Sequence, residues 1–320
     1  MPDRQHATAE QVTVALCSIG RPELVTALSA VRAGDTDAVR EVVIVDNAGG
    51  ALDVPLLRSL LDPVPLRVLQ GTGPAAAGRN LVLAQSRTDV VLFTDDDCVP
   101  TSSWVRELAC FMVANPSVAA AFGAVEPDAL PGARIRSVEI ADVGVVAWGE
   151  ASSSGDELWC PAISAPEWKP GIASGPPTVP WALVGSSNNL ALRRSRMLSG
   201  RPPFLPALGP GTAAGSGEDT ELGYALMAHG REIAYVPESL VFHHSWLGAS
   251  AAERAKRVYF RGNVEALGCH VLNADQRAGQ LLQAYLQHFC NVNGFADLGE
   301  VLEWGYGGHA VNATRTPLRK

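Results

Sequence analysis

Short apolar runs alternate with helix-like stretches through about the first 120 residues of the chain, a pattern typical of parallel strands joined by crossover helices. The apolar runs are Val12–Leu16, Glu41–Val45, Leu66–Leu69, Val90–Phe93 and Val118–Phe122. The stretches with helical character are Pro22–Val31, Leu56–Leu61, Ala75–Gln85 and Ser102–Ala114. Because the runs are apolar almost without a break, we expect a sheet covered on both faces. The pattern predicts an α/β fold with a mainly parallel, Rossmann-like sheet flanked by helices.

The amino-acid composition changes after Glu126, where proline, glycine and serine become frequent. We therefore expect an irregular insertion over residues 126–180. Order resumes with Trp181–Leu192, a helix over Asp219–Ala228, a strand over Ile233–Tyr235, and helices over Ala251–Leu267 and Asp275–Phe289. The last two helices have an apolar face to bury. We therefore expect a domain over residues 10–250 and a helical extension over residues 251–320 that packs on it.

Composition narrows the choice of function. The chain has 320 residues, 47% of them hydrophobic, and 25 basic against 33 acidic side chains give a formal charge of −8. No basic run is present to follow a phosphate backbone, which argues against nucleic acid as a partner. No export signal and no run of ~20 apolar residues is visible, and the six cysteines lie far apart. These features predict a cytoplasmic protein with reduced thiols and no transmembrane segment, and they leave a homo-oligomer open.

The strongest chemical signal is the carboxylate triplet Asp95, Asp96 and Asp97, which directly follows the apolar run Val90–Phe93. Neighbouring carboxylates repel one another, and a bound divalent cation would reverse that cost. Their hard oxygens favour Mg²⁺ or Mn²⁺ over zinc. The alternative is a solvated acidic turn that caps the following helix.

Other polar residues follow the neighbouring predicted strands. Ser18 and Arg21 lie in the turn after the first strand, Asp46 follows the second, and Arg79 lies one turn into the helix that begins near Ala75. In open α/β sheets ligands bind beyond the carboxyl ends of the strands, so these residues are expected to share one rim and to contact a nucleotide. Taken singly, each has a plain structural explanation as a cap, a turn residue or a surface arginine.

In this order the motifs resemble those of family 2 glycosyltransferases of GT-A fold, which are inverting enzymes that use nucleotide-diphospho-sugars. The resemblance covers roughly residues 10 to 250, with a donor-binding half over 10–125 and an acceptor-binding half over 126–250. It continues through the segments Gly185–Arg194, Gly217–Gly223 and Pro237–His243.

The resemblance implies a role for each candidate residue. The donor nucleotide would be bound by Ser18, Arg21, Asp46, Arg79, Asp95 and Asp96. The metal, Mn²⁺ or Mg²⁺, would be held by Asp97 and His243, with His244 as the alternative histidine. Asp219 would act as general base, Glu218 would orient the acceptor, and Trp181 and Asn189 would contact it.

Some alternatives remain at the level of sequence. Asp219 can also be explained as a helix N-cap, and His243 as a core histidine bonded to backbone. The resemblance implies transfer of a sugar from a UDP-, dTDP- or GDP-linked donor to a hydroxylated small-molecule, peptide or carrier-linked acceptor. The competing functions are a nucleotidyltransferase, although the first turn lacks the repeated glycines expected there, and a non-catalytic relative that binds sugar nucleotides.

Overall fold

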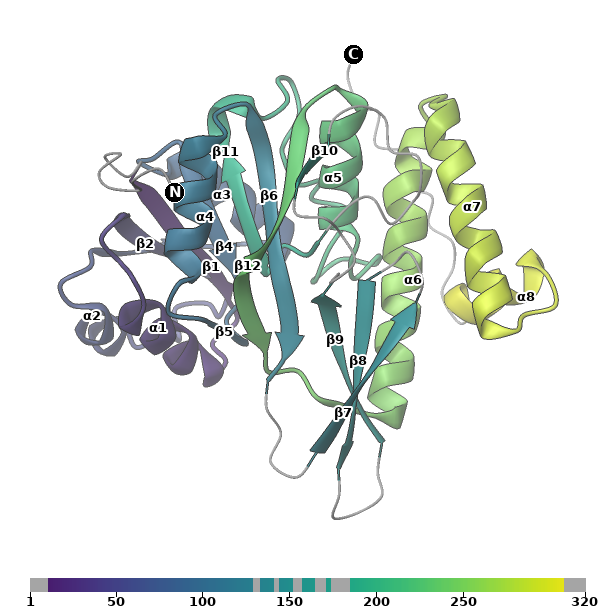
Figure 1. The fold of residues 1–320 in the computed structure, drawn as a ribbon, viewed down its shortest axis with the longest axis horizontal. Coiled ribbons are helices and arrows are strands. Elements are labelled where there is room, and N and C mark those ends of the chain that lie inside the picture. Colours follow the sequence, from purple (N-terminus) through teal and green to yellow (C-terminus); the bar gives the residue numbers. More distant parts are fainter. Residues whose placement is uncertain are drawn as a thin grey trace, which may run out of the picture.

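The computed structural model describes residues 11–128, 133–140, 144–151, 157–164, 171–173 and 185–307. Its centre is a mixed sheet flanked by helices (Figure 1). The first strands are β1 (Val12–Ser18), β2 (Val39–Asp46), β3 (Leu66–Gln70), β4 (Val90–Thr94), β5 (Cys98–Pro100) and β6 (Val118–Pro127). The helices between them are α1 (Glu23–Ala33), α2 (Val54–Leu61), α3 (Ala75–Gln85) and α4 (Trp104–Ala114).

Four of these strands form the parallel part of the sheet, in the order β3-β2-β1-β4. Their carboxyl ends therefore meet at one edge, which brings together Ser18, Asp46, Gln70 and Thr94. The predicted α/β fold is confirmed, and so is the prediction that the polar residues after these strands share a rim.

Alternate side chains of the strands enter two apolar cores, one on each face of the sheet. Val14 and Leu16 pack with α1 and α4 on one face. Ala15 packs on the other face, in a core that also contains Phe93 and side chains of α3. Successive strand residues point to opposite faces, so a strand buried on both sides must be apolar at every position. This requirement explains the nearly unbroken apolar runs.

The second half of the chain adds strands to the same sheet. They are β11 (Asn189–Arg193), which is antiparallel to both β4 and β6, and β12 (Glu232–His243), which is parallel to β6 and antiparallel to β5. Helix α5 (Glu218–Ala228) lies between them in sequence, and a short 3-10 helix, η2 (Arg194–Arg196), follows β11. The strand predicted at Ile233–Tyr235 is the first part of β12, whose register breaks between Val236 and Leu240.

The expectation of an irregular insertion over residues 126–180 was wrong for the part that the structure describes. That part contains β7 (Ala133–Ile140), β8 (Gly144–Ala151), β9 (Glu157–Ser164) and β10 (Gly171–Ala173). Strands β7, β8 and β9 form an antiparallel layer joined through β9 to β6, at the bottom of Figure 1. Arg134 lies between Ala133 and Ile135, but the consecutive polar residues Arg136 and Ser137 break the two-residue period of β7. The proline, glycine and serine of this region favoured a loop instead.

The chain ends in helices packed on the sheet domain. After β13 (Leu247–Gly248) come α6 (Ala249–Val271), α7 (Gln276–Asn293) and α8 (Leu298–Tyr306), of which α8 was not predicted. Helix α6 packs against α5 and β9, and α7 and α8 lie on its outer side, around an aromatic cluster that contains Phe260, Tyr285 and Phe289 (Figure 1). No helix within the described residues is both long and apolar enough to cross a bilayer.

Candidate active site

The carboxylate triplet lies at the end of β4 and is tied to the turn after β1. The hydroxyl of Ser18 donates to Oδ2 of Asp96 at 2.7 Å, and the Nη1 atom of Arg21 lies 3.4 Å from Oδ1 of the same residue. Arg21 also forms an ion pair with Asp97. Burial raises the pKa of Asp96, although Ser18 and Arg21 both oppose that shift. Ser18, Arg21 and the triplet thus form one connected polar group at the predicted rim.

The structure brings His243, rather than His244, beside the triplet. Because β12 pairs with β5 so that His243 lies opposite Cys98, the Nε2 atom of His243 comes 3.6 Å from Oδ1 of Asp97. The ring of His244 turns away, and its Nδ1 atom lies 3.1 Å from Asp128. Burial opposes ionisation of Asp97, but the contact with His243 and the charge of Arg21 outweigh it and hold the pKa of this carboxyl below its usual value.

The residues around Asp97 fit a divalent cation. Ligand atoms of Asp97, Cys98 and His243 lie within 4.8 Å of one another. Burial raises the pKa of the Cys98 thiol well above its usual value, so this sulfur stays protonated and is a poor ligand. The remaining donors are an ionised carboxylate oxygen and an imidazole nitrogen, a set that suits Mn²⁺ or Mg²⁺ with further ligands from a diphosphate.

Arg79 links the triplet to a second acidic group, the carboxylate pair Glu218 and Asp219. Its guanidinium lies 2.9 Å from Oδ1 of Asp95 and 3.0 Å from Oε1 of Glu218, and it is 5.7 Å from the centre of the Phe204 ring. Only 3% of Arg79 is exposed. The guanidinium is thus fully engaged in ion pairs with Asp95 and Glu218, and it holds these two carboxylates in position.

Asp46 organises the loop that follows β2. Its carboxylate accepts hydrogen bonds from the backbone N–H of Ala48 at 2.7 Å and of Gly50 at 3.0 Å, and a third from the side chain of Gln70 at 3.3 Å. The carboxylate therefore holds the ends of β2 and β3 together at the rim where the sequence predicts the nucleoside.

The carboxylate pair begins helix α5. The N-cap of this helix is Gly217, with a φ of +94°, a conformation that favours glycine. Asp219 therefore lies inside the first turn, and the N-cap explanation for it does not hold. Its carboxylate accepts hydrogen bonds from the backbone N–H of Ser187 at 3.2 Å and of Thr220 at 2.8 Å.

Both members of the pair have raised pKa values. Burial, followed by the neighbouring charge of Asp219, raises the pKa of Glu218 to about 7. Burial also raises the pKa of Asp219, against the hydrogen bonds from Thr220 and Ser187. The dipole of α5 favours ionised carboxylates at its N-terminus, but the loss of solvent outweighs the dipole.

Of the two residues expected to contact the acceptor, the structure describes only Asn189. Asn189 is fully buried in β11, and its amide is bonded to the indole of Trp104 at 2.8 Å and to the carbonyls of Ala124 and Ser239 at 2.7 and 2.9 Å. These bonds hold neighbouring strands together and leave no group for an acceptor. Trp181 lies outside the described residues.

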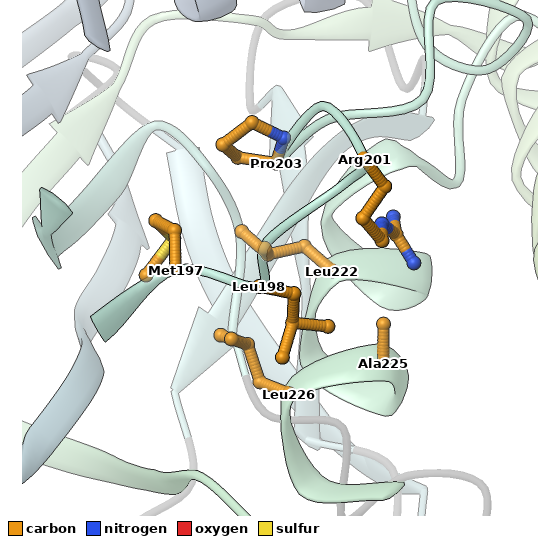
Figure 2. Close-up of a pocket in the computed structure, with 7 residues that line it drawn as sticks. All are labelled: Met197, Leu198, Arg201, Pro203, Leu222, Ala225 and Leu226. Atoms are coloured by element: carbon orange, nitrogen blue, oxygen red, sulfur yellow. The ribbon is translucent and has the colours of Figure 1, made fainter. Parts of the chain in front are cut away.

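A small pocket lies beside α5, and none of the site's carboxylates lines it. Figure 2 shows its lining, which comes from the segment after η2 and from α5: Met197, Leu198, Arg201, Pro203, Leu222, Ala225 and Leu226. Its empty volume of about 170 Å³ is below the roughly 300 to 1,000 Å³ of typical ligand pockets. Arg201 itself is paired with the buried Glu221 at 2.5 Å. We therefore place the functional site at the carboxylates rather than in this pocket.

Comparison with known families agrees with this placement. Residues 14–140 match the sequence model of the family described as glycosyl transferase family 2. This part of the chain is a family 2 glycosyltransferase domain. The match includes the carboxylate triplet, Ser18, Arg21, Asp46 and Arg79, and it supports a glycosyltransferase over the nucleotidyltransferase alternative. A search of curated protein sequences gives no match.

Solved structures of S. aureus TarS share the fold of the glycosyltransferase domain and its C-terminal helices. TarS 1–349 superposes with a TM-score of 0.54 at 17% identity, over 92% of this chain and 77% of that chain. TarS 1–349 in complex with UDP-GlcNAc superposes with a TM-score of 0.56 at 16% identity, over 93% and 80% of the two chains. The TarS structure without a stated residue range gives 0.57 at 16% identity, over 93% and 48%.

Proposed function

We propose that the chain is a metal-dependent, inverting glycosyltransferase that moves a hexose-type sugar from a nucleotide-diphospho-sugar to a hydroxyl of an acceptor. The observation that carries the proposal is the opposite direction of the pKa shifts of Asp97 and of the pair Glu218 and Asp219. The pKa of Asp97 is held low, as a metal ligand needs, whereas burial raises the pKa of Glu218 to about 7 and also raises that of Asp219, as a base needs. Arg79 contacts both groups.

The chemistry follows from these positions. The Asp219 carboxylate takes the proton of the acceptor hydroxyl, and the acceptor oxygen forms a bond to the anomeric carbon. The bond from that carbon to the diphosphate oxygen breaks, and the nucleotide diphosphate leaves with the electron pair. A divalent cation held by Asp97 and His243 would supply positive charge to the leaving diphosphate. Attack opposite the leaving group inverts the anomeric centre.

The remaining candidate residues support donor binding in this proposal. The proposal assigns the nucleobase to Asp46, and the ribose and the donor sugar to Asp95 and Asp96. Ser18 and Arg21 orient Asp96 and Asp97. UDP-GlcNAc is the first donor to test, because it is the ligand in the TarS complex with the same fold.

The test is nucleotide binding with and without metal. UDP, dTDP and GDP are titrated calorimetrically into the protein with Mn²⁺, and again with a chelator. We expect one nucleotide to bind with metal and to lose at least ~10-fold in affinity without it, because uncompensated phosphate and carboxylate charges repel.

Asp97→Ala should lose the metal-dependent part of this affinity, whereas Asp37→Ala, an exposed carboxylate in the turn before β2, should not. Equal nucleotide affinity with and without metal, in both the wild type and Asp97→Ala, would remove the metal assignment. Metal-dependent binding without any release of UDP from UDP-sugars would favour the non-catalytic relative.

A further inference from the structure

Helix α6 lies outside the segment that matches the family, yet it carries an aromatic side chain to the carboxylate pair. Tyr259 is 42% exposed, although its two neighbours Val258 and Phe260 are packed against the loop before α5 and in the aromatic cluster of α7 and α8. An exposed aromatic ring in the middle of a long, packed helix is the feature that needs explanation.

The contacts of α6 place Tyr259 relative to the start of α5. The Thr220 hydroxyl donates to Oδ1 of Asn263 at 2.8 Å, and Gly262 lies so close to Gly217 that a Cβ on Gly217 would come within 2.2 Å of the Gly262 carbonyl oxygen. Tyr259 lies three and four residues before Gly262 and Asn263, so it occupies the same face of α6 one turn earlier. This face of α6 packs on the first turn of α5, which contains Asp219, and Tyr259 lies one helical turn before the contact.

The charges around the phenol agree with this placement. Partial burial and, after it, the negative charges of Asp219, Asp97 and Glu218 raise the pKa of Tyr259. Cys160 belongs to β9, against which α6 packs, and its thiol donates to the backbone carbonyl of His243 at 3.4 Å. Tyr259 is therefore influenced by the carboxylate pair on one side and by the Asp97–His243 group on the other.

We propose that Tyr259 is an acceptor-contacting residue whose ring packs against the apolar face of an uncharged, ring-bearing acceptor while the acceptor hydroxyl faces Asp219. An aromatic face suits the C–H face of a pyranose or an aryl ring. The surrounding carboxylates, with a bound nucleotide diphosphate, disfavour an anionic acceptor. The assignment rests on the proposed function and extends the active site to α6.

The test measures acceptor binding separately from donor binding. The protein is saturated with Mn²⁺ and UDP, and the affinities of 4-nitrophenyl β-glucoside, as the ring-bearing probe, and of glycerol, as the acyclic probe, are measured by NMR titration. The variants are Tyr259→Ala, Tyr259→Phe and Tyr259→Leu, with Leu272→Ala as control. Leu272 is 64% exposed and directly follows the last turn of the same helix.

We expect Tyr259→Ala and Tyr259→Leu to weaken binding of the glucoside at least ~10-fold, and Tyr259→Phe less than ~3-fold, because the ring face carries the contact. UDP affinity with Mn²⁺ and glycerol binding should stay within twofold in all variants. Tyr259→Leu retains apolar volume and decides the matter if the alanine variant does not fold.

The two proposals fail in different ways. Absence of Mn²⁺-dependent nucleotide binding in the wild type would overturn the proposed function. Nucleotide binding with unchanged glucoside affinity in Tyr259→Ala and Tyr259→Leu, or with no glucoside binding in the wild type at all, would overturn the assignment of Tyr259 alone.

Discussion

The carboxylate triplet after β4 and the carboxylate pair at the start of α5 contain the same chemical group in different surroundings. Asp97 of the triplet is in contact with Arg21 and His243, and its pKa lies below the usual value. Glu218 contacts the buried Arg79, Asp219 accepts backbone hydrogen bonds, and the pKa values of both are raised. Contacts with His243 and Arg21 lower the pKa of Asp97, whereas burial raises the pKa values of Glu218 and Asp219.

This difference supports the roles that we propose for the two groups. A metal ligand must be ionised at all working pH values, and a general base is most effective when its pKa lies near the pH of the reaction. The buried Arg79 contacts one carboxylate from each group, so it couples their positions as well as their charges. Replacing a carboxylate by an amide should therefore have different effects on activity and stability in the two groups.

The largest expected effect is that of Asp219→Asn. The substitution retains size and hydrogen-bonding shape while removing the base, so the rate of transfer from UDP-GlcNAc should fall by ~10²- to 10⁴-fold with donor affinity nearly unchanged. Steady-state kinetics and calorimetry measure the two quantities. The neighbouring Glu218→Gln should lose less, since it removes no proton acceptor from the reaction. Near-normal turnover of Asp219→Asn would move the base to Glu218.

A second expected effect concerns the contact that holds the pair in place. In Gly262→Ala the new Cβ would lie 2.5 Å from the backbone carbon of Ser216, which cannot move as a side chain can. We expect a loss of roughly 3 kcal/mol in the free energy of unfolding, as for severe overpacking, and a lower transfer rate.

The matched control for this substitution is Gly268→Ala in the same helix, where a Cβ meets nothing within 4 Å. It should stabilise the protein by roughly 0.5 to 1 kcal/mol, because alanine has the higher helix propensity. Denaturant unfolding compares the two variants. Equal effects would mean that α6 is not fixed to the loop before α5.

The smallest expected effect is a pH dependence of stability that Glu218 should cause and Asp97 should not. The pKa of Glu218 in the folded protein is about 7, against 4.5 for an ordinary glutamate. The folded state thus binds this proton more tightly than the unfolded state, and its contribution to stability is complete below pH ~4.5 and is lost as the pH rises through ~7.

The Glu218→Gln variant has no carboxyl group to titrate at this position, so it does not lose this stability as the pH rises. Relative to the wild type it should gain roughly 1 to 3 kcal/mol in the free energy of unfolding between pH 5 and pH 8, measured by denaturant titration. Asp97→Asn, whose parent carboxyl has a lowered pKa, should not become relatively more stable over this interval. If the two variants change in the same direction, the contrast between the groups is not electrostatic.

The prediction of the fold succeeded where the signal is local. The first five apolar runs are β1, β2, β3, β4 and β6, and the helix predicted at Ala75–Gln85 is α3 residue for residue. It failed over β7, β8 and β9, because the frequent glycine, proline and serine residues in this part of the sequence favoured an irregular loop. Helix α8 is nine residues long and was missed.

By itself, the sequence determined the order of strands and helices and the carboxylates at the strand ends. Unbroken apolar runs predict buried strands, and a 3.6-residue period of apolar positions predicts helices, so few other assignments of these segments are possible. Only the tertiary structure decided that Arg79 contacts both Asp95 and Glu218, the second of which lies 139 residues after Arg79 in the chain. Only the register between β12 and β5 chose His243 over His244, and only the packing of α6 on α5 brought Tyr259 to the carboxylate pair. Such contacts depend on how distant elements pack, and no short-range pattern along the chain encodes that packing.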